Sequence, residues 1–143
     1  MVIREFNIKD LRRVYEIERK SFKDPYHPLF LLELYDLFPS TFLVAEVNFR
    51  VVGYVIARKI NGEGHIIAIA VDPEYRRRGI GSALMHEVIE RLRNKGVKKI
   101  WLEVRVSNKE AIEFYKCLGF SIDCVSPHYY SDGEDAIILT LIL

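Results

Sequence analysis

The sequence predicts a mixed α/β fold that forms one domain over residues 1–143, and three observations carry this prediction. Half of the 143 residues are hydrophobic, which suits one sizeable core better than two small ones. Runs rich in β-branched and aromatic residues alternate with segments whose apolar residues recur at helical spacing. A strand, a helix and a second strand follow one another between Gly64 and Val104, and such a connection places two strands parallel.

The first third of the chain predicts one strand and two helices. Residues 2–6 read VIREF, a short strand, and Asn7 stands where an N-cap would precede apolar residues at helical spacing. Residues 23–28 read KDPYHP, and the two prolines interrupt the helical pattern. Residues 29–38 resume as a short, strongly apolar helix that ends before Pro39. A stiff loop therefore joins the two helices.

The rest of the chain predicts six strands and two helices. β-Branched and aromatic runs predict strands at 41–47, 51–60, 64–72, 98–104, 120–126 and 135–143. An apolar stripe that includes Leu84 and Leu92 predicts the third helix, which Gly96 closes. A cap at Ser107 or Asn108 begins the fourth helix, and Gly119 ends it.

Composition and charge exclude several classes of partner. The chain has 21 basic and 20 acidic residues, so its formal charge of +1 provides no general attraction for nucleic acid or anionic membranes. The longest uncharged apolar stretches are too short to span a bilayer, and the first residues do not resemble a signal peptide. We therefore expect a cytoplasmic protein that contacts neither nucleic acid nor membrane. We expect no metal, because the histidines and cysteines lack metal-ligand spacing, and Cys117 and Cys124 are interpreted as reduced packing residues.

The segment EYRRRGIGSAL, residues 74–84, combines three arginines with two glycines between a strand and a helix. The first N–H groups of a helix lack internal partners, and glycines let the backbone approach an anion closely. The arginines would add charge-assisted hydrogen bonds, so a pyrophosphate is a natural ligand. The segment lacks the lysine of a Walker loop, and Leu84 stands where a dinucleotide fingerprint needs its third glycine. A capped helix with solvated arginines remains the alternative.

The arginine segment and three further segments show a family resemblance. Arg76-x-x-Gly79-x-Gly81 resembles the acetyl-CoA pyrophosphate loop of the GNAT superfamily of N-acetyltransferases. The segment LEVRVSNKEAIEFYKCLGF, residues 102–120, looks like the second half of RimI-type and archaeal NatA-like N-terminal protein acetyltransferases. Residues 128–136 and the segment FKDPY, residues 22–26, are similar to the tail and the substrate loop of the same group. RimI-type enzymes usually have tryptophan at the position of Tyr26, so the first-residue preference stays open.

The resemblance implies a GNAT-like twisted sheet of about seven strands with four helices, splayed between the fourth and fifth strands, where acetyl-CoA binds as the cosubstrate. Backbone groups of the strand that ends near residue 71 would pair with the pantetheine arm, the arginine turn would hold the diphosphate, and the next helix would reach the arm. The residues expected to bind acetyl-CoA are Ile69, Ala70, Val71, Arg76, Arg77, Arg78, Gly79, Ile80, Gly81, Ser82, Asn108 and Tyr115.

The resemblance also implies catalytic and substrate-binding residues. Glu103 matches the assigned base, while strand alternation alone would also fit an ordinary exposed glutamate. Tyr115 is the candidate acid toward the CoA sulfur, or else a core aromatic, and His65 is a second possible base through a water, or else a structural histidine. The residues expected to hold the peptide are Phe22, Pro25, Tyr26, Tyr129 and Tyr130.

The leading hypothesis is an enzyme that acetylates the α-amine of ribosomal or nascent proteins, with a ribosome or an auxiliary subunit as a possible partner. One alternative keeps acetyl-CoA but changes the acceptor to an internal lysine or a small amine. Another is a non-catalytic module that binds CoA or RNA through the arginines. The near-zero net charge argues against RNA.

Overall fold

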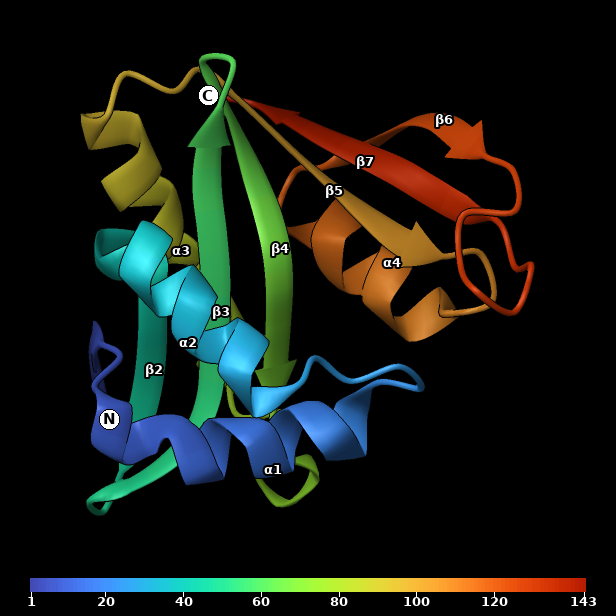
Figure 1. Ribbon diagram of the computed structural model, residues 1–143. Helices are drawn as coiled ribbons and strands as arrows, with labels where there is room; N and C mark the ends of the chain where they lie inside the picture. The colour runs from blue at the N-terminus through green and yellow to red at the C-terminus, as the bar shows by residue number, and fades with distance from the viewer. The chain divides into compact units, whose positions relative to one another are not determined.

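The structure is a computed structural model that describes residues 1–143, and it has the predicted seven strands and four α-helices in the predicted order (Figure 1). The strands are β1 (Val2–Glu5), β2 (Phe42–Val47), β3 (Arg50–Ile60), β4 (Glu63–Val71), β5 (Lys99–Arg105), β6 (Ser121–Ser126) and β7 (Ala136–Ile142). The helices are α1 (Leu11–Ser21), α2 (Pro28–Leu37), α3 (Ile80–Asn94) and α4 (Lys109–Cys117). The strands form one mixed sheet in the order β1-β2-β3-β4-β5-β7-β6, which confirms the predicted fold class.

Three short 3₁₀ turns were not predicted: η1 (Ile8–Asp10), η2 (Pro39–Thr41) and η3 (Pro73–Tyr75). The first of them shifts the predicted cap. Asn7 accepts a hydrogen bond from the Lys9 N–H at 3.0 Å, and the Asn7 N–H donates to Asp10 Oδ2 at 2.8 Å. This capping box opens η1, and α1 follows only at Leu11.

The chain divides into two compact units. The first unit comprises residues 1–58 and 66–95, and the second comprises residues 59–65 and 96–143.

In the first unit, one face of the strands packs against α1 and α2. Phe42, Val44, Tyr54 and Ile56 alternate along β2 and β3 and are fully buried in this core. Figure 1 shows α1 and α2 in front of these strands. The start of α3 approaches β3 so closely that a Cβ atom at Gly53 would lie 3.2 Å from Leu84 Cδ1. A side chain at this position would push away the helix that follows the arginine turn.

In the second unit, β5 is the central strand. It pairs with β4 in parallel through Gly64 and His65, opposite Ile100 and Trp101, and with β7 in antiparallel fashion along its whole length. The parallel pair confirms the strand-helix-strand prediction. The ladder between the fourth and fifth strands is short, as an open sheet requires.

β6 is the outermost strand and pairs only with β7, so most of its side chains are exposed. Cys117 and Cys124 are free thiols as predicted, but both are exposed. Their interpretation as packing residues is therefore wrong. None of the helices is long and apolar enough to cross a bilayer.

Candidate active site

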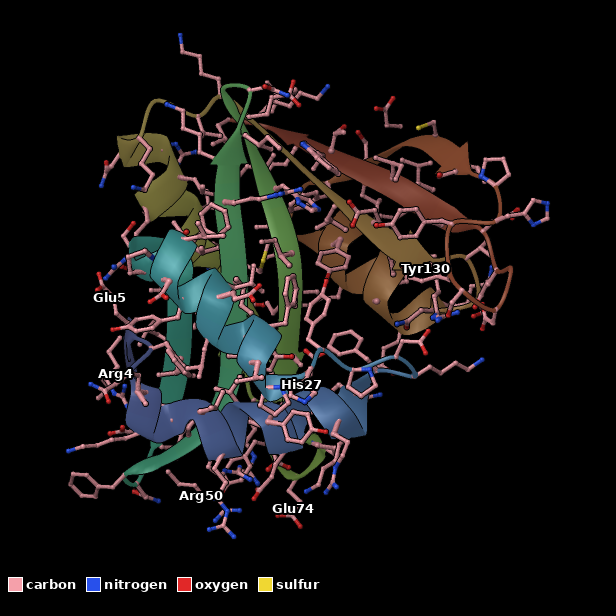
Figure 2. All side chains as sticks on the ribbon, viewed as in Figure 1. Arg4, Glu5, His27, Arg50, Glu74 and Tyr130 are labelled. Atoms are coloured by element: carbon pink, nitrogen blue, oxygen red, sulfur yellow. The ribbon has the colours of Figure 1, made fainter.

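The arginine turn begins where β4 ends. Asp72 caps η3 by accepting a hydrogen bond from the Glu74 N–H at 3.1 Å, and Figure 2 labels Glu74 on this turn. Arg77 and Gly79 have φ angles of 63° and 78°, in the left-handed region that a glycine adopts without steric cost. Gly79 is the N-cap of α3 and contributes no side-chain cap. The first N–H groups of α3 are therefore left for an anion.

A partly buried ion pair fixes the start of this turn. The Arg13 guanidinium on α1 donates to Asp72 Oδ2 at 2.8 Å and to the Val51 carbonyl through two nitrogens, at 3.0 and 2.9 Å. Burial acts to raise the pKa of Asp72, but the hydrogen bonds from Arg13 and the Glu74 N–H outweigh it, and the pKa is lowered. Sequence reasoning missed this pair, because 59 positions separate its members.

The three arginines of the turn differ in what their side chains contact. Arg76 Nε donates to the Val71 carbonyl at 3.1 Å, and Arg78 donates to the Glu74 carbonyl at 3.3 Å. The Arg78 guanidinium also lies 5.0 Å from the centre of the Tyr75 ring. Arg76, Arg77 and Arg78 are all exposed. The Ile80 side chain is 4% exposed, so this residue could contact a ligand only through its backbone.

The two candidate bases form a hydrogen-bonded pair in the second unit. His65 Nε2 lies 2.7 Å from Glu103 Oε1, and the His65 ring stacks on Trp101 with ring centres 3.9 Å apart. The side chains of His65 and Glu103 are 9% and 12% exposed, so Glu103 is not the ordinary exposed glutamate that strand alternation alone allowed. Burial alternates along β5, with Leu102 and Val104 buried on the other face, as the strand pattern predicted. A proton on one member of the pair can be shared with the other.

Tyr115 and Tyr130 stay protonated at neutral pH. Burial raises the pKa of the Tyr115 phenol well above its usual range, and the charges of Tyr130 and Glu103 add to the effect. Burial and the Glu103 charge raise the pKa of Tyr130 to about 12. A phenol that remains neutral can donate a proton to a thiolate or a hydrogen bond to a carbonyl. Tyr115 also packs edge-on against Phe120, so the core interpretation holds for its ring.

An ionic network positions the loop between β6 and β7. Arg105 Nη1 donates to Asp132 Oδ2 at 3.0 Å and to Glu134 Oε1 at 2.9 Å, and its guanidinium lies 4.0 Å from the centre of the Tyr130 ring. The Tyr130 N–H donates to the Glu134 carbonyl at 3.1 Å, and Figure 2 labels Tyr130 on this loop. Tyr129, 50% exposed, meets Tyr130 edge-on. The sequence singled out both tyrosines but not the role of Arg105.

Asn108 is the N-cap of α4, where its Oδ1 accepts a hydrogen bond from the Ala111 N–H at 3.1 Å. The predicted cap is therefore confirmed.

The predicted substrate loop joins α1 to α2. Phe22 is 40% exposed, and Pro25 and Tyr26 are partly buried. Tyr26 packs against the core of the first unit and lies 5.0 Å from Phe30, measured between ring centres. His27 Nδ1 then accepts the Leu29 N–H at 3.0 Å and begins α2.

Comparison with known proteins identifies the fold and the chemistry. Residues 11–120 match the Acetyltransferase (GNAT) family. The chain belongs to this family. An N-alpha-acetyltransferase of Sulfurisphaera tokodaii is 37% identical over 150 aligned positions, which cover 96% of this chain and 90% of the relative.

Solved structures agree with the GNAT assignment. The crystal structure of Ard1 from Thermoplasma volcanium has a TM-score of 0.96 and 39% identity, and the match covers 99% of this chain and 97% of Ard1. Naa20 of Chaetomium thermophilum, in complex with a bisubstrate analogue, has a TM-score of 0.92 and 28% identity, covering 100% of this chain and 87% of Naa20. The predictions of a GNAT N-acetyltransferase and of acetyl-CoA as its cosubstrate are confirmed.

Within this GNAT domain, no group of three or more His, Cys, Asp or Glu side chains is placed to hold a metal ion.

Proposed function

We propose that this GNAT enzyme is an N-alpha-acetyltransferase that acetylates the N-terminal amine of proteins. The observation that carries the proposal is the Glu103–His65 pair, which offers a partly buried proton acceptor in the second unit. Its support comes from the similarity to the Sulfurisphaera tokodaii N-alpha-acetyltransferase, which covers 96% of this chain and 90% of that relative. We further propose that residues 1–143 act as one acetyltransferase domain, in the cytoplasm, where nascent and ribosomal proteins are made.

In the first unit, we propose that the arginine turn binds the diphosphate of acetyl-CoA. The N–H groups of residues 77–82 would donate to its oxygens, which explains the left-handed Arg77 and Gly79. Arg76 would add charge, although its Nε now contacts the Val71 carbonyl. Backbone groups of residues 69–71 would bind the pantetheine arm as an added strand does. For the second unit, we propose that Asn108 binds acetyl-CoA through the part of its amide not used as the cap.

The chemistry follows from the protonation states. A protein α-amine has a reference pKa of about 7.7–8.0, so most of it is charged at neutral pH and requires a proton acceptor. We propose that the Glu103–His65 pair accepts this proton. The amine nitrogen then attacks the thioester carbon, and a C–N bond forms. As the C–S bond breaks, the departing sulfur takes the Tyr115 proton. The nitrogen gives up its second proton, which restores the Tyr115 phenol through solvent. Because its pKa is raised, Tyr115 stays protonated until the C–S bond breaks and the thiolate forms.

We propose that two loops recognise the peptide. Phe22, Pro25 and Tyr26 would wall the pocket for its first residue, and the exposed Phe22 ring and the partly buried rings of Pro25 and Tyr26 suit an uncharged side chain. Tyr129 and Tyr130 would hydrogen-bond its backbone, and the Arg105 network holds their loop for that task. A ribosome or an auxiliary subunit would then act by delivering nascent chains rather than by completing the chemistry.

A peptide panel tests the acceptor. Peptides that begin Ser, Ala, Met-Leu or Met-Glu are incubated with acetyl-CoA, each with a free and a blocked N-terminus and each with an internal lysine. We expect acetylation of free N-termini only, located by mass spectrometry. Equal turnover of the blocked peptides would show that the acceptor is a lysine, and no turnover of any amine would favour a non-catalytic CoA-binding module.

A separate variant tests the diphosphate site. Gly81→Glu places a side chain and a negative charge in the first turn of α3, where the diphosphate would lie. Acetyl-CoA affinity should fall by at least about tenfold, a cost of roughly 1.4 kcal/mol. Circular dichroism establishes that the variant is folded. Unchanged affinity in a folded variant would place the diphosphate elsewhere.

A further inference from the structure

Glu18 is a buried carboxylate that the proposed chemistry does not use. It lies on α1 and is 2% exposed. No Lys, Arg or His side chain forms a salt bridge with it. Burial raises the pKa of Glu18, because no counter-ion offsets the cost of burying its carboxyl group, and an apolar side chain would avoid that cost. Packing of the first unit therefore does not explain why a glutamate occupies this buried position.

The hydrogen bonds of Glu18 point to that reason. Its Oε1 accepts the hydroxyl proton of Tyr54, a fully buried residue of β3. Its Oε2 accepts the N–H of Tyr26 at 3.0 Å. The carboxylate thus connects the rigid core of the first unit to the backbone of the loop between α1 and α2. The Glu18 carbonyl also accepts the Phe22 N–H at 3.1 Å, so the loop is held at its first residue and again at Tyr26.

The loop residues held in this way are those proposed to receive the first residue of the peptide. The Tyr26 ring packs on the core and against Phe30, so a shift of the Tyr26 backbone would move one wall of the pocket. An apolar residue at position 18 would remove the acceptor of the buried Tyr54 hydroxyl in the core and that of the Tyr26 N–H in the loop. The change from a carboxylate to an apolar side chain therefore affects both the core and the loop, and its effect on the loop is the one that reaches the peptide pocket.

We infer that Glu18 is a positioning residue that sets the first-residue selectivity of the enzyme by fixing the loop of residues 22–26. This inference rests on the proposed N-terminal acetyltransferase function. Glu18 does not contact the peptide, and it acts through the Tyr26 backbone. Glu18 therefore affects which peptides the enzyme prefers, while other residues bind acetyl-CoA and transfer protons.

The test compares three variants of the full chain. Glu18→Leu removes both acceptors, whereas Glu18→Gln keeps the shape and an amide oxygen that can still accept the Tyr26 N–H. Thr41→Val is the matched control, because the buried Thr41 hydroxyl donates to the Ala57 carbonyl at 2.5 Å and its loss perturbs the same unit without touching the loop. Each variant is assayed with free-N-terminus peptides that differ only in the first residue, and kcat and KM are measured separately.

An apolar pocket discriminates between substrates whose side chains differ by one methylene group by about 10- to 200-fold in kcat/KM. We expect Glu18→Leu to reduce the wild-type ratio between the best and worst first residues at least about fivefold, mainly through KM of the best peptide. The Kd for acetyl-CoA should stay unchanged. Glu18→Gln and Thr41→Val should keep the wild-type ratio. Hydrogen exchange should show faster exchange of the Tyr26 amide in Glu18→Leu alone.

Three results would overturn the inference: an unchanged ratio in Glu18→Leu, an equal loss in Thr41→Val, or an equal loss in Glu18→Gln. If Glu18→Leu does not fold, Tyr54→Phe weakens the same anchor without altering α1, and its ratio decides in the same way. A wild-type protein that acetylates no free N-terminus would refute the proposed function instead. The Tyr26 amide exchange would then still report whether Glu18 holds the loop, so the two failures are distinguishable.

Discussion

Replacing Glu103 by glutamine separates the proton-accepting role of this residue from its structural role. The backbone of Glu103 pairs with Ile138 of β7, and the substitution leaves this pairing intact. Glutamine has nearly the shape of glutamate and can keep one hydrogen bond to His65 Nε2, now 2.7 Å from the carboxylate. A general base contributes about 10²- to 10⁴-fold to the rate, which corresponds to roughly 3–5 kcal/mol of transition-state stabilisation. We therefore expect kcat to fall at least about 100-fold while the free energy of unfolding changes by less than about 1 kcal/mol.

The assay is steady-state acetylation of a good peptide substrate between pH 6 and pH 9.5. Below the amine pKa of about 7.7–8.0 the variant lacks the group that removes the ammonium proton, and above it the amine is already neutral. The deficit of Glu103→Gln should therefore be largest at the acidic end and narrow toward the alkaline end. His65→Asn should show a deficit of the same kind, because the two side chains form one hydrogen-bonded pair.

The double variant supplies the decisive control. When two residues act as a unit, the double variant loses little more activity than either single variant. Glu103→Gln with His65→Asn should thus be within about threefold of the slower single variant. A Glu103→Gln enzyme that keeps kcat within about threefold of the wild type at pH 7 would refute the assignment of Glu103 as the base. Fully multiplicative deficits would instead show two independent roles.

Two other substitutions probe groups with shifted pKa values. Tyr115→Phe removes the buried phenolic proton, so kcat should fall by about 10²-fold in the same assay; unchanged kcat would exclude Tyr115 as the acid. Asp72→Asn keeps the cap on the Glu74 N–H but loses the charge that pairs with Arg13. Because the pKa of Asp72 is lowered on folding, its contribution is present above the unfolded value of about 3.9 and is lost as the pH falls through the folded value. Urea unfolding should find Asp72→Asn less stable by roughly 1.5–3 kcal/mol at pH 7, and this gap should close on acidification below about pH 5; a gap independent of pH would contradict the ionic role.

Local patterns were enough to predict most of the fold. The helix ends at Gly96 and Gly119 were read from the sequence, and both residues have positive φ angles, 84° and 99°. The alternation along β5 correctly separated Glu103 from the buried Leu102. These features depend on periodicity and turn chemistry within a few residues, which a single sequence displays. The exposure of Cys124 was missed, because a strand pattern does not tell whether the strand lies at the edge of its sheet.

In the candidate site, the sequence likewise revealed the reactive residues but not the contacts that hold them. Glu103, His65 and the tyrosines could be named in advance, since their residue types carry the chemistry. The contacts that hold these residues could not be named in advance, because the hydrogen-bonded partners are distant in the chain. His65 and Glu103 are 38 positions apart, and Glu18 and Tyr54 are 36 apart. Any acidic residue on α1 could in principle have been the one that turns inward. Only the folded chain shows that Glu18 does so.

The proposed catalytic groups and the proposed peptide-contacting residues lie on different kinds of element, so peptide preference can change without a change in the chemistry. The proposed proton-transfer groups are borne by strands of the sheet and by α4, whereas both proposed peptide-contacting segments are loops. Each loop is held by a side chain on a neighbouring regular element: Glu18 on α1 holds the Tyr26 backbone, and Arg105 on β5 holds the loop that carries Tyr130. Loops accept substitutions that strands in a packed sheet do not. A relative with a different first-residue preference should therefore differ at the loops and their anchors while keeping the Glu103–His65 pair, because the chemistry of acetyl transfer is common to every first residue and the fit of the pocket is not.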